Sequence, residues 1–77
     1  MKLTIEIIKN FFQEDQKPRR RLTYMIPNRP FDDFVKDELM WVESTGDDFI
    51  TVFRCMDGKR YDFYQKDLYK LSMTARG

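Results

Sequence analysis

The sequence predicts a small, mostly β domain: one antiparallel sheet of about five strands, with one short helix near residues 31–40. Three observations support this fold class. Residues 38–43, 49–56 and 60–64 are three strand-like runs, separated by the turn-forming sequences STGDD and DGK. Two earlier stretches alternate apolar and polar residues, which is the period of a strand. Aromatic residues make up 16% of the 77-residue chain and can fill one small core. The alternative is an α+β domain whose helix packs on a three- to four-stranded antiparallel sheet.

The first alternating stretch is KLTIEIIK, in which polar residues separate Leu3, Ile5 and Ile7. Because isoleucine and phenylalanine favour strands, we expect a strand over residues 3–12. The alternation fails at Ile8, so a helix over the same residues stays open as the alternative.

The second alternating stretch is RLTYMI, residues 21–26, and it stops at Pro27. A polar connection containing Pro18 separates it from the first stretch, so the two are expected to form a hairpin with a long basic loop at its tip.

The next segment, PFDDFVKDEL, has the features of one short helix. Pro30 stands near its start, and Asp32 and Asp33 fall in the first turn, where negative charge suits the helix dipole. Four apolar residues would then share one face.

The second half of the chain predicts its own register. A two-residue turn at Asp57-Gly58 would pair Val52 with Phe63. A two-residue turn at Thr45-Gly46 would bring Leu39 and Trp41 to the core face that also holds Ile50, Val52, Tyr61 and Phe63. A three-residue loop over 45–47 would bring Met40 and Val42 to the core instead. After the third strand, Leu68 and Leu71 are expected to pack back on the sheet.

The composition favours one domain over residues 1–77 and argues against an enzyme. The chain has no histidine and three glycines, so the commonest general base and a glycine-rich phosphate loop are both missing. Cys55 falls in an apolar run and is expected to be a buried, inert thiol. The acidic residues fit no calcium loop, so we expect no metal and no cofactor.

With no leader, no apolar run of membrane length and a single cysteine, we expect a complete cytoplasmic protein without a membrane partner.

Residues 49–71, FITVFRCMDGKRYDFYQKDLYKL, resemble the closing strands of SH3-like small barrels of the Tudor and KOW kind. The shared elements are a strand, the Asp57-Gly58 hairpin, a second strand, a turn with Asp67-Leu68, and a last strand beginning at Leu71. The resemblance implies an SH3-like barrel and a binding module, without naming a ligand. The N-terminal half departs from that pattern.

The charge pattern favours a protein partner. Residues 32–48 hold seven acidic residues against Lys36, a net charge of −6, and the segments on both sides are basic. Such opposed patches steer partners and favour self-association. We expect a small regulator or inhibitor of the kind that phages and mobile elements encode. The predicted protein-binding residues are Asp32, Asp33, Asp37, Glu38, Glu43, Asp47 and Asp48.

Nucleic-acid binding is the alternative function. Basic side chains in the first loop could contact phosphates, and aromatic side chains on the sheet could stack on bases. The residues predicted for that role are Lys17, Arg19, Arg20, Arg21 and Tyr24. Against it, the acidic segment would repel a phosphate backbone within a Debye length of about 8–10 Å.

Overall fold

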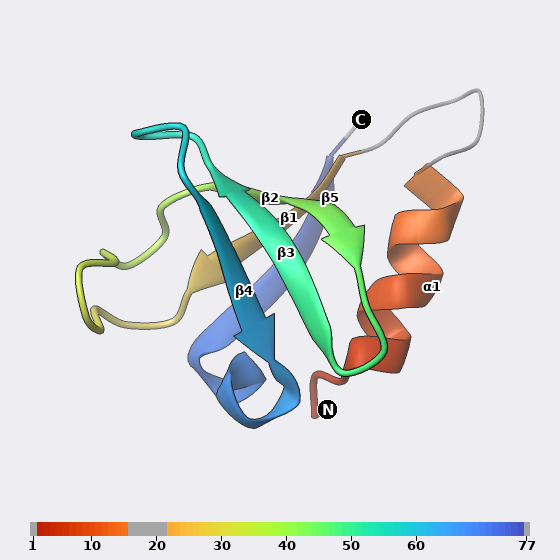
Figure 1. The fold of residues 1–77 in the computed structure, drawn as a ribbon. Helices are drawn as coiled ribbons and strands as arrows, with labels where there is room; N and C mark the ends of the chain where they lie inside the picture. The colour runs from red at the N-terminus through yellow and green to blue at the C-terminus, as the bar shows by residue number, and fades with distance from the viewer. Residues whose placement is uncertain (1, 16–21, 77) are drawn as a thin grey trace.

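The structure, a computed structural model, describes residues 2–15 and 22–76 and confirms the predicted fold class (Figure 1). Five antiparallel strands form one open sheet, accompanied by one α-helix and one 3-10 helix. In chain order the elements are α1 (Ile5–Asp15), β1 (Leu22–Pro27), β2 (Met40–Thr45), β3 (Phe49–Arg54), β4 (Arg60–Tyr64), η1 (Gln65–Lys70) and β5 (Leu71–Arg76).

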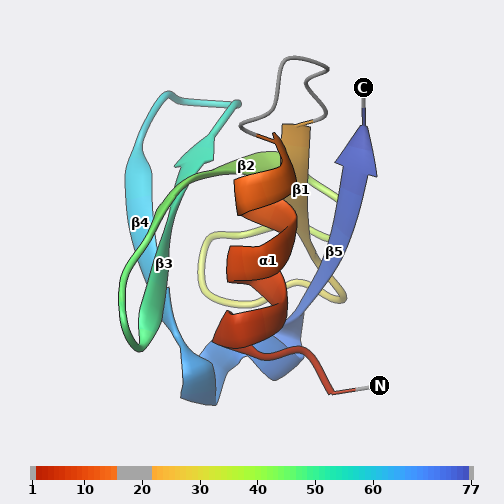
Figure 2. The same cartoon turned by 90° about the vertical axis from the view of Figure 1, so that its right-hand side faces the viewer.

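The strand order is β4-β3-β2-β1-β5, so the last strand returns to pair with the first, and β4 and β5 form the two edges. Figure 2 shows α1 in front of the sheet, while η1 joins β4 to β5 below it. At 11 residues, α1 is too short to cross a membrane, and the described parts of the chain hold no other candidate span.

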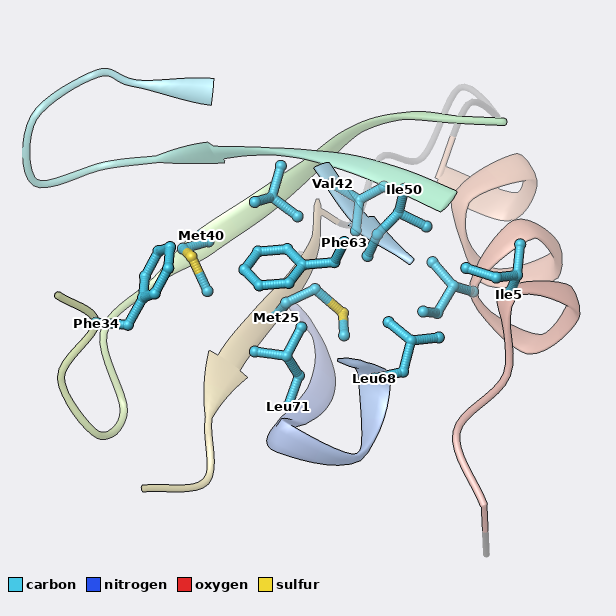
Figure 3. Close-up of a cluster of buried hydrophobic side chains, with 11 residues drawn as sticks. Ile5, Met25, Phe34, Met40, Val42, Ile50, Phe63, Leu68 and Leu71 are labelled. Carbon is cyan, nitrogen blue, oxygen red and sulfur yellow. The ribbon is translucent and has the colours of Figure 1, made fainter. Parts of the chain in front are cut away.

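The core lies between the sheet, α1, η1 and the segment that joins β1 to β2 (Figure 3). Each strand contributes alternate residues to it, and α1 contributes two isoleucines. Burying a side chain of this size stabilises the fold by about 2 kcal/mol. The buried hydrophobic residues are Ile5, Ile8, Met25, Phe34, Met40, Val42, Ile50, Val52, Phe63, Leu68 and Leu71.

The expected strand over residues 3–12 is wrong, because most of that range lies in helix α1. Ile5 and Ile8 are buried in the core, with Phe12 packed against it, which is the spacing of one helix face. The Thr4 hydroxyl accepts a hydrogen bond from the Ile7 N–H at 3.2 Å and so caps the first turn. Helix contacts with the rest of the fold overrode the strand propensity of the isoleucines.

The helix expected near residues 31–40 is also wrong, because this segment is a loop. Phe31 and Phe34 exchange backbone hydrogen bonds of 3.1 and 2.8 Å, which closes a tight turn. Asp32 and Asp37 have φ angles of 48° and 67°, in the left-handed region that a helix cannot use. Aspartate tolerates this conformation better than most residues, so the acidic residues favour turns here.

The turn between β2 and β3 follows the alternative with a longer loop. Three residues separate the strands, Thr45 pairs with Ile50, and the register shifts between Val42 and Ser44. The extra residue at this register shift reverses the faces to which the preceding side chains of β2 point, since side chains alternate along a strand. Met40 and Val42 therefore enter the core, and Leu39 and Trp41 do not.

Trp41 and Phe63 consequently lie on opposite faces of the sheet, against the prediction that they share the core. Phe63 is buried, and Trp41 stacks on Phe53 on the outer face, with ring centroids 4.8 Å apart and planes 14° from parallel.

The turn between β3 and β4 is also longer than expected. The Arg54 N–H donates to the Lys59 carbonyl at 2.8 Å, and Val52 pairs with Tyr61 instead of Phe63. A shift of two positions keeps every side chain on its predicted face. Cys55 is exposed in this turn, which corrects the prediction of a buried thiol.

Candidate functional site

A cavity of about 270 Å³ opens beside β4, between the tight turn at Phe31–Phe34 and η1. Its lining combines four aromatic with four charged residues: Phe31, Phe34, Tyr61 and Phe63, and Asp32, Asp62, Asp67 and Lys70.

The four rings form one packed cluster. The Phe34 ring lies 5.0 Å from the Phe31 ring, 4.9 Å from the Tyr61 ring and 5.6 Å from the Phe63 ring, centroid to centroid. Tilted and edge-on contacts of this kind are favourable. The turn at 31–34 folds onto two core-facing residues of β4, so the aromatic wall requires contact between distant parts of the chain.

The buried Arg54 side chain packs against two rings of this aromatic cluster. Its side chain is only 3% exposed, and its guanidinium centre lies 4.9 Å from the centroids of both the Phe34 and Tyr61 rings. Its Nε donates to an Asp57 carboxylate oxygen at 3.1 Å, and its Nη1 lies 3.6 Å from a buried oxygen of Glu38. These contacts tie the β1–β2 loop to the β3–β4 turn.

The ion pair with Asp57 shifts the pKa values of both partners. The hydrogen bond from Arg54 lowers the pKa of Asp57 to about 2, and the N–H of Lys59 supports the same carboxylate. The hydrogen bond to Asp57 also raises the pKa of Arg54. Arg54 therefore stays charged at every pH at which the protein folds, and it serves the site by positioning the rings.

Negative charge exceeds positive charge at the mouth of the cavity. The Lys70 ammonium lies 3.7 Å from an Asp67 oxygen and 5.1 Å from the Phe31 ring centroid. Asp62 adds no charge here, because strand alternation directs its carboxylate to the outer face, where it accepts a hydrogen bond of 2.7 Å from the Thr51 hydroxyl. Asp32 is exposed in its turn. The carboxylates of Asp32 and Asp67 against one ammonium leave a net charge of −1, which favours a cationic ligand.

The carboxylates around the cavity do not form a metal centre. Within residues 2–15 and 22–76, no three histidine, cysteine, aspartate or glutamate side chains are placed to hold one ion. The aromatic wall and dispersed carboxylates suit a larger organic cation, since a ring attracts a positive group through its face.

The predicted acidic residues do not form one surface. Only Asp32 lines the cavity. Most of the others have separate surroundings: Asp33 and Glu38 lie beside Arg54, Asp37 beside Lys36, Glu43 beside Arg60, and Asp47 and Asp48 in the β2–β3 turn. Sequence reasoning missed Asp62 and Asp67, since nothing local shows that the 31–34 turn folds against them.

The residues predicted for nucleic-acid binding are mostly outside the described part of the chain, namely Lys17, Arg19, Arg20 and Arg21. Tyr24 lies on the outer face of the sheet, where it pairs across the strands with Trp41.

The outer face holds a second aromatic group. Trp41 and Phe53 stack on each other, and the Arg60 guanidinium lies 5.5 Å from the Phe53 centroid. Arg60 is in turn held by Glu43 at 2.7 and 2.9 Å, which raises the pKa of Arg60. A base that stacked on Phe53 would compete with these contacts.

A larger cavity of about 580 Å³ lies on another side of η1, and its lining includes Lys2, Lys66 and Tyr69. The Gln65 side chain in this lining is used within the fold: it accepts a hydrogen bond from the Ile5 N–H at 2.9 Å and donates one to the Leu3 carbonyl at 3.2 Å. We therefore take the smaller, charged and aromatic cavity as the candidate site.

Comparison with known proteins adds no assignment: no protein-family model, curated protein or solved structure matches this chain.

Proposed function

We propose that the protein is a non-enzymatic module that binds a basic segment of a partner protein, with one lysine or arginine side chain entering the cavity beside β4. The observation that carries this proposal is the position of Lys70. Its ammonium lies 5.1 Å from the Phe31 centroid and 3.7 Å from Asp67, so the cavity mouth already attracts a cation of this kind. A further carboxylate, that of Asp32, remains to receive a second one.

The charge of the site supports a basic protein partner over nucleic acid. A phosphate group entering the cavity would meet the carboxylates of Asp32 and Asp67 in its lining, inside the Debye length of about 8–10 Å. An ammonium or guanidinium group meets the same carboxylates favourably. Action as a cytoplasmic regulator or inhibitor, and kinship with SH3-like barrels, stay predictions from the sequence.

Fluorescence anisotropy with three labelled probes tests the proposal. The probes are a short peptide alternating lysine with valine, the same peptide with glutamate for lysine, and a single-stranded oligonucleotide of similar length. We expect the lysine peptide alone to bind at about 50 mM salt, and more weakly as salt rises. Stronger binding of the oligonucleotide or the glutamate peptide would overturn the proposal.

Two double variants locate the site. Asp32→Asn with Asp67→Asn removes two charges at the cavity, so we expect binding to weaken by roughly 5- to 20-fold. Asp47→Asn with Asp48→Asn removes the same charge from the β2–β3 turn, outside the cavity lining, and serves as the matched control. Equal weakening by both would show that net charge, and not this cavity, holds the peptide.

A further inference from the structure

The outer edge of β4 carries backbone groups whose direction can be derived from the β3–β4 ladder. In an antiparallel pair, hydrogen-bonded and non-hydrogen-bonded residue pairs alternate. Two bonds, one at each end of the ladder, determine which residue pairs are the hydrogen-bonded ones. The Arg54 N–H donates to the Lys59 carbonyl at 2.8 Å, and the Gln65 N–H donates to the Asp48 carbonyl at 3.2 Å. With the observed register, Tyr61 and Phe63 bond to β3.

Arg60, Asp62 and Tyr64 therefore direct their backbone N–H and carbonyl groups away from β3, toward the open side. All three residues are exposed, and β4 ends the strand order. In the part of the chain that the structure describes, no backbone hydrogen bond joins these groups to another element. Figure 1 shows β4 at the margin of the sheet, with β3 as its only neighbouring strand. No proline or bulge interrupts its pairing with β3, so this edge is a template for one more strand.

The candidate cavity opens beside this same edge. Tyr61, Asp62 and Phe63 of β4 all line it. A strand paired to β4 would place every second side chain toward the cavity, since side chains alternate across a sheet. The backbone edge and the cation site thus lie within reach of one extended segment.

We propose that the basic partner segment binds as an extended strand paired to the free edge of β4, with a lysine or arginine side chain in the cavity. The inference rests on the proposed function and specifies how the partner binds. Charge complementarity supports this occupant: the cavity mouth has a net charge of −1, and Glu43 holds Arg60, the cation of the edge, at 2.7 Å.

A second copy of the chain fits this edge less well. A second copy has two free edges of its own, β4 and β5. The β4 sequence, RYDFY, holds one basic residue, Arg60, which Glu43 already holds at 2.7 Å, and the β5 sequence, LSMTAR, holds one basic residue at its very end. A β5 strand paired to β4 would bring apolar and hydroxyl side chains to the cavity and leave the carboxylates unmatched.

The first test compares the labelled lysine–valine peptide with a version N-methylated at every backbone nitrogen. Methylation keeps the charges and side chains but removes the N–H donors. We expect methylation to weaken binding at least 10-fold. If both peptides bind equally and the Asp32→Asn, Asp67→Asn variant weakens both, the strand pairing is wrong and the proposed function stands. If neither peptide binds, both proposals fail.

The second test measures amide hydrogen exchange by NMR with and without the unmodified peptide. We expect protection of the Arg60, Asp62 and Tyr64 amides to rise at least 10-fold, with no change at Phe63, which already bonds to β3.

The free edge of β5 is the matched control within the same molecule. The Asn28 N–H bonds the Lys70 carbonyl at 2.9 Å, so by alternation the Met73 and Ala75 amides face away from β1. Protection of these amides in place of those on β4 would overturn the inference. Protection of the β4 amides that rises with protein concentration in the absence of peptide would assign the edge to a second copy and overturn it as well.

Discussion

Replacing Lys70 by glutamine is expected to tighten the binding of a basic peptide, although it removes a residue from the site. The Lys70 ammonium occupies the cavity mouth, 3.7 Å from Asp67 and 5.1 Å from the Phe31 centroid. A ligand ammonium must share these groups with Lys70 or displace it. Lys70→Gln leaves the carboxylate and the ring face to the ligand.

The size of the effect follows from the two contacts. A partly exposed ion pair contributes about 0.2–1 kcal/mol, and a cation over an exposed ring about 0.5–1 kcal/mol. Releasing both groups is therefore expected to favour the ligand by roughly 1 kcal/mol, which is about a 5-fold lower Kd. The same contacts are lost from the fold, so stability should fall by a similar small amount.

Lys66→Gln is the matched control for this measurement. Lys66 lies in the same 3-10 helix, is exposed, and lines the other cavity, so it changes the net charge equally without changing the site. Anisotropy titrations of the lysine–valine peptide at low salt should give a lower Kd for Lys70→Gln than for Lys66→Gln. Equal Kd values for the two variants would refute the reasoning, since only overall charge would then matter.

Two other predictions concern stability. Met40→Ala should lower the free energy of unfolding by about 3 kcal/mol, because Met40 is fully buried, whereas Leu39→Ala should lower it by about 1 kcal/mol or less. Urea unfolding followed by circular dichroism compares the two variants. A larger loss for Leu39→Ala would mean that β2 presents its other face to the core. Folding lowers the pKa of Asp57 from an ordinary value of about 3.9 to about 2, so its ion pair with Arg54 stabilises the protein fully above about pH 4 and is lost as pH falls toward 2. Urea midpoints between pH 2 and 5 should decline less steeply in Asp57→Asn, and an unchanged slope would exclude this group as the cause.

The candidate site shows where sequence reasoning stops. The charge pattern predicted an acidic surface beside aromatic residues, and the cavity beside β4 has both features. Yet Asp32 is the only predicted acid that lines it, because the other carboxylate that faces the cavity, that of Asp67, comes from η1. Distances between side chains on three separate elements follow from how the chain folds back, and no local pattern encodes them.

The sequence alone determined the properties that local chemistry controls. Alternating residues and turn formers placed β1, β2, β3 and β4, and strand alternation put Ile50, Val52, Tyr61 and Phe63 on one face of the sheet even though the β3–β4 turn is longer than expected. These features depend on neighbours along the chain.

Tertiary structure decided the helix, the faces of β2 and the site. Residues 5–15 suit a strand or a helix by propensity, and packing of Ile5 and Ile8 in the core selected the helix. One additional residue within β2, at the register shift between Val42 and Ser44, turned Trp41 outward and Met40 inward, because a register shift of a single residue reverses both faces. Small differences in local preference leave such choices open, and burial of apolar surface across the whole domain then selects among them.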